Sequence, residues 1–244
     1  MKQSDFTILS NQKIAQDVYE MKLAGDTSAI TAPGQFVNIR LDGLFLRRPI
    51  SVCDYDANSL TLIYKVVGTG TAQMSRMQAG EKLDLLTGLG NGYNLSKSGE
   101  KPLLIGGGVG VPPLYNLAKQ LVAAGKHPVA VLGFNSEKDV FYKEEFEKLG
   151  VQTHIATADG SMGQKGFVTD VVKTLQDYSY FYTCGPEPML KAVYDVTATD
   201  GEFSFEERMG CGFGACMGCS CKTKYGNKRI CKEGPVLCKE EIIW

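Results

Sequence analysis

The chain has 244 residues, of which 26 are basic and 27 acidic, so its formal charge is −1. This balance excludes the basic surface that nucleic acid or an anionic membrane would require. Hydrophobic residues make up 43% of the chain, which is typical of a globular protein, but no apolar run approaches the roughly 18 residues that a membrane span needs. The polar N-terminus, Met1–Asp5, leads into no apolar segment like that of a secretory signal, so we expect a cytoplasmic protein.

Residues 1–98 have the pattern of an antiparallel β domain. Residues 36–41 alternate apolar and polar side chains, as a half-buried strand does. Residues 59–67 are rich in β-branched and aromatic side chains. Turn signals such as Ala32-Pro33-Gly34 and Ala79-Gly80-Glu81 separate the runs, and short strands at this spacing predict a small barrel.

In residues 99–200 the apolar patterns of strands alternate with those of helices. Such alternation predicts a parallel sheet with crossover helices, so the expected fold class is multidomain, β plus α/β. We expect strands over 102–105, 128–134, 151–156 and 178–183, and helices over 113–124, 140–149, 168–175 and 188–197.

Residues 201–244 are rich in glycine and cysteine and predict a small module built around an inorganic centre. Six of the eight cysteines, from Cys211 to Cys238, lie within 28 residues. In a chain without signs of secretion, cysteines this close together indicate a metal or cluster site rather than disulfides. Cys53 stands alone and is expected to be a small core residue.

Three thiols are spaced as C-x4-C-x2-C: Cys211, Cys216 and Cys219. This is the plant-type [2Fe–2S] spacing, in which a fourth thiolate comes from further along the chain. Cys231 and Cys238 are the candidates, and we favour Cys231, which follows a strand-like segment. A zinc site of Cys216, Cys219, Cys231 and Cys238 is the alternative, but it leaves Cys211 without a role.

Two segments of the β domain suggest a flavin site. Arg48 and Ser51 form an R-x-x-S pattern, in which the arginine fork suits a pyrophosphate and the hydroxyl can bond a flavin nitrogen. Ile63-Tyr64-Lys65 and the Gly68–Thr71 loop follow, and such a loop can present amide groups to phosphate. Taken alone, each pattern also fits an ordinary surface arginine or a hairpin turn.

Glycine-rich turns of the second domain predict a nucleotide site. The segment Gly106–Pro113 follows a predicted strand and precedes a predicted helix, where close backbone approach and the helix N-terminus favour a diphosphate. Cys184-Gly185-Pro186 ends another strand, and Cys184 either lies close to hydride transfer or shapes the pocket as a small residue. The loop 135–139 is mixed in charge and has no arginine, which favours NAD over NADP.

Other polar groups of this domain are expected to be structural. Asp159-Gly160-Ser161 could touch the nucleotide, but an ordinary surface turn explains it better. His127 and His154 are the only histidines, and neither lies near a nucleophile or a carboxylate pair in the sequence.

The order of these parts resembles the ferredoxin-NADP reductase family, over roughly residues 1–200. That family combines an FAD-binding antiparallel barrel with a nicotinamide-nucleotide domain. The resemblance implies that Arg48 contacts the FAD pyrophosphate and that Ser51 lies near the reactive flavin nitrogen. It implies a flavin site of Arg48, Pro49, Ile50, Ser51, Ile63, Tyr64, Lys65, Gly70 and Thr71, and a nucleotide site of Gly106, Gly107, Gly108, Gly110, Cys184, Gly185 and Pro186.

The C-terminal motifs narrow the resemblance. Residues 206–219 and 229–236 are similar to those of the electron-transfer subunits of B-type, NAD-dependent dihydroorotate dehydrogenases. This resemblance spans the chain and implies the cluster ligands Cys211, Cys216, Cys219 and Cys231.

The implied function is electron transport in pyrimidine biosynthesis. Electrons would pass between NAD(H), FAD, a [2Fe–2S] cluster and the FMN of a separate catalytic subunit, in a heterotetramer of two subunits of each kind. The alternatives are the FAD and [2Fe–2S] subunit of a sulfhydrogenase or of an NADH-dependent ferredoxin-NADP oxidoreductase. From another class of protein, a zinc-stabilised interaction module on an inactive flavin fold is a further alternative.

Overall fold

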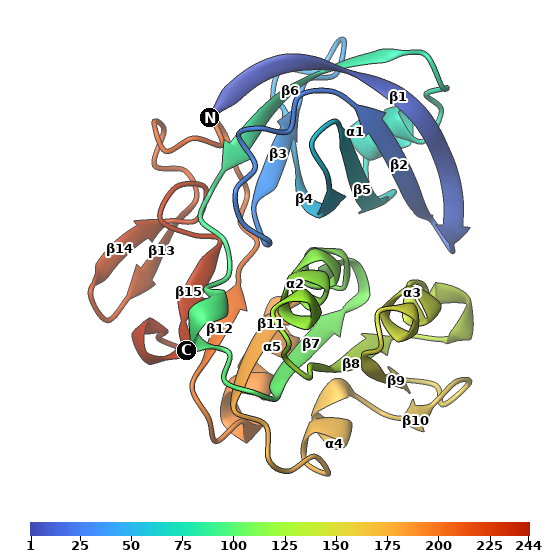
Figure 1. Cartoon of the computed structure of the whole chain (residues 1–244). Coiled ribbons are helices and arrows are strands. Elements are labelled where there is room, and N and C mark those ends of the chain that lie inside the picture. Colours follow the sequence, from blue (N-terminus) through green and yellow to red (C-terminus); the bar gives the residue numbers. More distant parts are fainter.

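The N-terminal part of the chain is a closed β-barrel (Figure 1). The computed structural model describes all 244 residues. Around the barrel the strands follow the order β1-β2-β5-β4-β3-β6, and all neighbours are antiparallel. Alternation along each strand turns one row of side chains inward, which forms a buried core of residues such as Phe6, Val37 and Leu62. The strands are β1 (Lys2–Ala15), β2 (Val18–Ala24), β3 (Phe36–Ile39), β4 (Arg48–Tyr55), β5 (Ser59–Lys65) and β6 (Lys82–Leu89), with the short helix α1 (Thr69–Met74) between the last two.

The second part is a seven-stranded sheet in the order β10-β9-β8-β7-β11-β12-β15. All of its neighbours are parallel except β12 and β15. Helices α2 and α3 pack on one face, and α4 and α5 on the other. The elements are β7 (Pro102–Gly107), α2 (Pro112–Ala123), β8 (Val129–Phe134), α3 (Lys143–Lys148), β9 (Gln152–Thr157), β10 (Gln164–Lys165), α4 (Val168–Val172), β11 (Tyr180–Cys184), α5 (Glu187–Val196), β12 (Gly201–Ser204) and β15 (Val236–Cys238).

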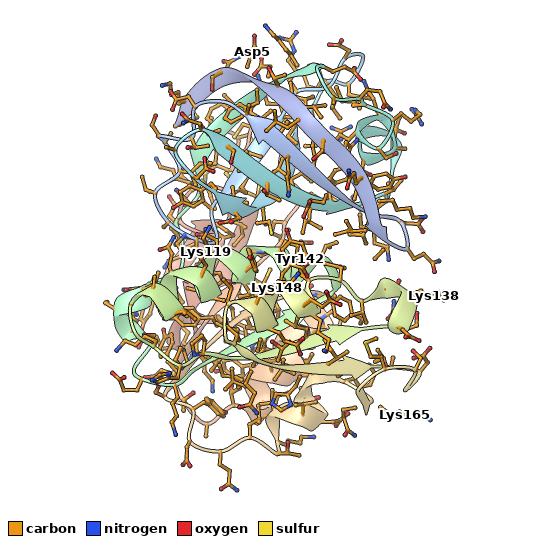
Figure 2. All side chains as sticks on the ribbon, turned by 45° about the vertical axis from the view of Figure 1, so that its right-hand side comes forward. Asp5, Lys119, Lys138, Tyr142, Lys148 and Lys165 are labelled. Carbon is orange, nitrogen blue, oxygen red and sulfur yellow. The ribbon has the colours of Figure 1, made fainter.

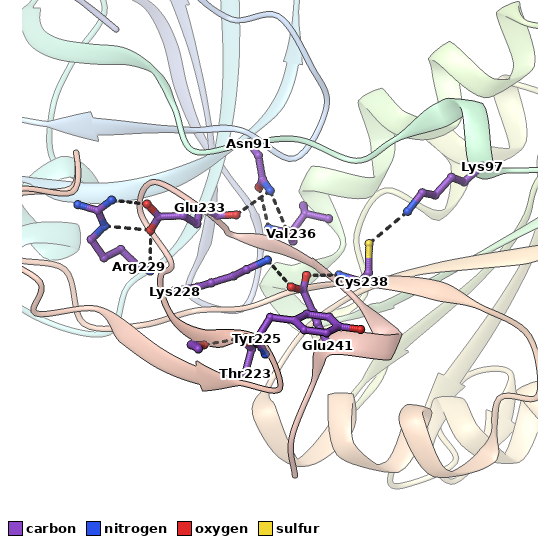
Figure 3. A network of polar contacts seen from close by, with 11 residues as sticks. Asn91, Lys97, Thr223, Tyr225, Lys228, Arg229, Glu233, Val236, Cys238 and Glu241 are labelled. Atoms are coloured by element: carbon purple, nitrogen blue, oxygen red, sulfur yellow. Dashed lines mark hydrogen bonds and ion pairs between the residues drawn. The ribbon is translucent and has the colours of Figure 1, made fainter.

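The C-terminal segment leaves this sheet and returns to it. After β12 the chain forms the cysteine-rich loop and the hairpin of β13 (Ser220–Thr223) and β14 (Gly226–Arg229), and then comes back as β15. Asn91, which follows the barrel, donates to the carbonyls of Glu233 and Val236 and accepts from the Val236 amide, as Figure 3 shows. The segment is therefore tied both to the sheet and to the end of the barrel.

Polar contacts also join the barrel to the helices above the sheet. Asp54 of β4 accepts hydrogen bonds from Asn116 Nδ2, at 2.6 Å, and Lys119 Nζ, at 2.8 Å. The Tyr142 hydroxyl donates to Glu20 of β2 at 2.7 Å. Figure 2 shows Lys119 and Tyr142 at the boundary between the two parts. These contacts fix the barrel on one side of the sheet.

The predicted barrel, parallel sheet and crossover helices are confirmed, with element ends shifted by a few residues. Short 3₁₀ helices occur at η1 (Leu95–Lys97), η2 (Gly108–Gly110), η3 (Glu137–Asp139) and η4 (Lys239–Glu241). None of the helices has the length and apolar character that a membrane crossing requires.

Candidate flavin, nucleotide and cluster sites

A cavity of about 620 Å³ lies where the sheet faces the barrel. Its walls combine the turn after β7, from Gly107 to Gly110, with Gly185 and Pro186 after β11. Lys65 reaches it from the end of β5 in the barrel. The structure thus brings together one residue of the predicted flavin set and most of the predicted nucleotide set. A cleft at the carboxyl ends of parallel strands is the usual position of a nucleotide in such sheets.

Gly110 allows the two nucleotide motifs to meet. A Cβ atom at this position would lie 2.2 Å from the carbonyl oxygen of Cys184, which is far too close for any side chain. Gly106 and Cys184 are not in the cavity wall but lie directly behind it, paired across β7 and β11. Glycine is required here because the backbones themselves are in contact.

The Cys184 thiol is buried and stays protonated at neutral pH. Burial raises its pKa to about 12, and the nearby Glu206 carboxylate acts in the same direction. Glu206 lies in the cavity wall, where desolvation raises the pKa of its carboxyl. A neutral thiol behind the wall agrees with the reading of Cys184 as a small residue that shapes the pocket.

The R-x-x-S segment and the Gly-Thr segment meet on the barrel surface. Gly70 lies in the first turn of α1, and a Cβ there would be 2.3 Å from Nε of Arg48. Glycine therefore leaves room for the guanidinium group against this turn. The Thr71 hydroxyl accepts hydrogen bonds from the amides of Val67 and Gly68, so these two amides are used within the turn.

The three predicted residues at the end of β5 point in different directions, because side chains alternate along a strand. Tyr64 faces the barrel core, and its hydroxyl donates to Asn11 at 2.9 Å. Ile63 faces the other way and packs in the core shared with the nucleotide domain. Lys65 alone lines the cavity.

The outer face of β3 and β4 lies beside the cysteine-rich loop. Phe36 of β3 is opposite Ser51 in the strand pairing, and Asn38 is opposite Pro49. Phe36 packs in one cluster with Cys219 and Cys231. The strand with the predicted flavin motif is therefore one strand away from the predicted iron ligands.

Backbone amides of the cysteine loop point at its sulfur atoms. The amides of Ala215 and Cys216 donate to Cys211 Sγ at 3.2 and 3.4 Å. The amides of Cys211 and Gly218 donate to Cys216 Sγ, both at 3.4 Å. Burial opposes ionisation of the Cys211 thiol, but the amide donors prevail and lower its pKa to about 6. Donors aimed at sulfur are the environment that thiolate ligands of a cluster require.

The four predicted ligands form two neighbouring pairs. Cys211 lies with Cys216, and Cys219 lies with Cys231, whose amide donates to Cys219 Sγ at 3.4 Å. Burial, followed by the hydrogen bond with Cys219, raises the pKa of Cys231 to about 12. No three of the chain's cysteine, histidine or acidic side chains converge closely enough to enclose a single metal ion.

The remaining cysteines have other surroundings. Cys238 lies at the end of β15, and its sulfur accepts a hydrogen bond from Lys97 Nζ at 3.2 Å, as Figure 3 shows. Cys221 packs at the edge of the apolar cluster around Phe36. Cys53 is fully buried in the core, as predicted.

Some cavity residues have no clear signal in the sequence. Phe141 and Glu206 line the cavity from loops, and Asp139 does so from the end of η3. Only Asp139 could have been found from the sequence, because it lies in the loop after the second strand of the nucleotide domain, where such sheets contact the nucleotide ribose. Asp159 does not line the cavity. The Ser161 hydroxyl donates to Asp159 and accepts from the Glu137 amide, so this turn is bonded to the loop that follows β8. Neither histidine lines the cavity.

Comparison with known proteins agrees with this arrangement. The family "Iron-sulfur cluster binding domain of dihydroorotate dehydrogenase B" matches residues 206–243, and the family "Oxidoreductase NAD-binding domain" matches residues 104–195. The dihydroorotate dehydrogenase B (NAD(+)) electron transfer subunit of Fusobacterium nucleatum is 47% identical, over 99% of both chains. That of a Geobacillus species is 44% identical, over 100% of this chain and 99% of the relative.

The chain belongs to the family of dihydroorotate dehydrogenase B electron transfer subunits. The resemblance inferred from the sequence is thereby confirmed. A solved structure of an NADH-dependent reduced ferredoxin-NADP oxidoreductase has a TM-score of 0.89 and 30% identity, covering 98% of this chain and 90% of that one. A ferredoxin NADP⁺ reductase from Neisseria gonorrhoeae, with a TM-score of 0.70 and 16% identity over 80% of this chain and 90% of its own, shares the fold.

The residues of this chain fit both an iron–sulfur cluster and FAD. The amide groups around Cys211 and Cys216 suit a cluster. The glycine that admits Arg48 against α1 suits a phosphate-bearing cofactor beside β4. An iron–sulfur cluster binding family matches the whole cysteine segment, and this match argues against the alternative of a zinc-stabilised module.

Proposed function

We propose that this chain is the electron-transfer subunit of an NAD-dependent dihydroorotate dehydrogenase. It would pass electrons between NAD(H), FAD and a [2Fe–2S] cluster, to or from the FMN of a catalytic subunit. The net reaction of the complex converts dihydroorotate and NAD⁺ to orotate, NADH and a proton. The observation that carries the proposal is the position of β4 in the barrel. It pairs on one side with β5, whose Lys65 lines the cavity, and on the other with β3, whose Phe36 packs with Cys219 and Cys231.

The chain's own residues bind and orient the groups. Arg48 would hold the FAD pyrophosphate, and Ser51 would lie beside the flavin ring. Pro49 and Ile50 complete this strand segment, while Lys65 closes the cavity from the barrel side. The turn from Gly107 to Gly110 would receive the nucleotide diphosphate.

The cavity favours NAD over NADP through its charges. Its charged wall residues are Lys65, Asp139 and Glu206, and only Lys65 is basic. The part contributed by the sheet domain therefore has no cation for a 2′-phosphate. Asp139 instead places a carboxylate near the loop that follows β8.

Two-electron and one-electron chemistry meet on this chain. Bound FAD can exchange a hydride with a nicotinamide and also exchange single electrons with a cluster held by Cys211, Cys216, Cys219 and Cys231. The protein's contribution would be to hold the flavin along β4 and the cluster loop beside the neighbouring strand β3.

The wider assembly follows from the family. We expect residues 1–98 to bind FAD, residues 99–200 to bind NAD(H) and residues 201–244 to bind the cluster. The partner would be an FMN-containing catalytic subunit, in a cytoplasmic heterotetramer of two subunits of each kind. No orotate site is expected on this chain.

The test is purification of the tagged chain from its own cells, followed by identification of co-purifying proteins and an assay for dihydroorotate-dependent reduction of NAD⁺. The expected result is an FMN-containing partner and that activity. An FAD- and iron-containing chain that instead co-purifies with a hydrogenase or a second ferredoxin-NADP oxidoreductase subunit would overturn the assignment and favour those alternatives.

A further inference from the structure

Asn38 is a buried polar residue between two predicted cofactor sites. It lies on β3, and its exposed fraction is 1%. Its neighbours Val37 and Ile39 face the barrel core, so the side chain of Asn38 faces outward, toward the cysteine-rich segment. Burying an amide is unfavourable unless its polar atoms are bonded, so both ends of this side chain need partners.

One end of the amide is bonded to the cysteine loop. Asn38 Nδ2 donates to the carbonyl oxygen of Cys211 at 3.3 Å. The next residue, Gly212, has a φ of +78°, and a Cβ there would lie 2.3 Å from Asn38 Nδ2. The loop therefore approaches this amide at a position where only glycine fits.

The other end has no partner in the protein. Asn38 Oδ1 is one of four buried side-chain polar atoms without a hydrogen bond, and it is the only acceptor-only atom among them. The Arg47 guanidinium is close, but it donates to the backbone carbonyl of Asn38. Across the strand pair Asn38 is opposite Pro49, within the R-x-x-S segment.

We propose that Asn38 is a positioning residue that joins the flavin to the cluster loop. Nδ2 holds the Cys211 carbonyl, and Oδ1 accepts a hydrogen bond from an N–H or O–H group of the flavin ring or ribityl chain of FAD bound along β4. The proposal rests on the proposed function, because it requires both groups on this chain. One side chain would then fix the cluster loop relative to the flavin.

Two variants separate the two ends of the amide. Asn38→Asp keeps an acceptor but lacks the donor. Asn38→Leu has the same branched shape and number of heavy atoms and lacks both. The matched control is Asn91→Leu, which removes an amide that also ties the C-terminal segment to the barrel but touches Glu233 and Val236 rather than the cysteine loop. The readouts are the dissociation constant of FAD by fluorescence, and iron content with the EPR spectrum of the reduced protein.

The expected pattern is specific. Asn38→Leu weakens FAD binding about 3- to 10-fold, the loss of one hydrogen bond, and shifts the EPR spectrum. Asn38→Asp binds FAD as the parent does but shifts the EPR spectrum, because the carboxylate repels the Cys211 carbonyl. Asn91→Leu changes neither readout.

Other patterns overturn the proposal. Equal FAD affinity in Asn38→Leu and the parent would show that Asn38 does not bond the flavin. Weakened FAD binding in Asn38→Asp would show the same. An unshifted EPR spectrum in both Asn38 variants would show that Asn38 does not position the cluster loop. Should Asn38→Leu fail to fold, Asn38→Asp alone still tests both contacts. A parent chain without FAD or iron would contradict the proposed function itself, which distinguishes that failure from failure of this inference.

Discussion

Four amide groups donate to the sulfurs of Cys211 and Cys216 before any iron is considered. Such donors stabilise thiolate charge, which is why the pKa of Cys211 falls to about 6 although its burial acts in the opposite direction. Cys219 and Cys231 lie in an apolar setting instead, and burial raises the pKa of Cys231. The segment thus offers amide donors to Cys211, Cys216 and Cys219, whereas the buried thiol of Cys231 depends on the metal to deprotonate it.

The fourth ligand can be decided by a pair of serine substitutions. We expect Cys231→Ser to remove or strongly alter the visible and EPR signals of the cluster while FAD remains bound, because Cys231 lies against Cys219. Cys238→Ser is the matched control, since its sulfur lies on β15 and is bonded to Lys97. Cluster loss in Cys238→Ser with an intact cluster in Cys231→Ser would reverse the assignment.

At the scale of elements, the turn of η2 is held directly against the end of β11. The contact between Gly110 and the Cys184 carbonyl leaves no space for a methyl group. Because both segments contribute to the cavity wall, their separation controls the shape of the nucleotide site. The contact between Gly110 and Cys184 therefore affects both the stability of the domain and the shape of its nucleotide site.

Gly110→Ala tests this contact. A methyl group there must push η2 away from β11, and overpacking of this kind costs about 1–3 kcal/mol of unfolding free energy. We expect a lower thermal midpoint and a raised KM for NADH in a diaphorase assay. Gly125→Ala is the control for backbone strain alone, because Gly125 has a positive φ, which Gly110 does not, and a Cβ there would meet nothing. An unchanged KM for NADH in Gly110→Ala, or a KM raised equally in Gly125→Ala, would show that the contact with Cys184 does not shape the nucleotide site.

Elements with a strong periodic pattern were predictable, and those completed by distant pairing were not. The alternation in residues 36–41 and the apolar run from Pro102 correctly predicted strands β3 and β7, but β3 is buried on both faces rather than half-buried. Strand β15 has only three residues, and its pairing with β12 joins segments more than thirty positions apart, so no local pattern reveals it. Helix α1 was missed because its Gly-Thr sequence is typical of a turn.

The site shows the same limit. The motifs around Arg48, Gly106 and Cys211 have spacings that imply chemistry, so they could be found from the sequence. Asn38 belongs to no motif, and Glu206 begins the C-terminal motif without a role of its own there. Their places in the structure follow only from strand register and from the shape of the cavity. The opposite directions of Ile63 and Tyr64 likewise needed the register of β5.

At the scale of the whole molecule, the nucleotide domain and the cluster segment share one sheet. β12 pairs with β11, and β15 pairs with β12, although both strands lie beyond the expected boundary at residue 200. Phe203 of β12 is fully buried, and its ring packs edge-on against Phe181 of β11. The cluster segment therefore completes the core of the nucleotide domain and is held in a fixed position against it.

A chain that ends at residue 200 should consequently be unstable. It exposes the edge of β11 and loses the burial of Phe203, which together cost at least about 3 kcal/mol. For a truncated chain of about 200 residues that corresponds to a thermal midpoint lower by about 6–12 °C. The control is full-length Cys216→Ser, which is expected to lose the cluster but keeps β12 and β15. A truncated chain as stable as this control by calorimetry would mean that the two strands add nothing to the nucleotide domain, and that the segment from residue 201 onward is an independent module.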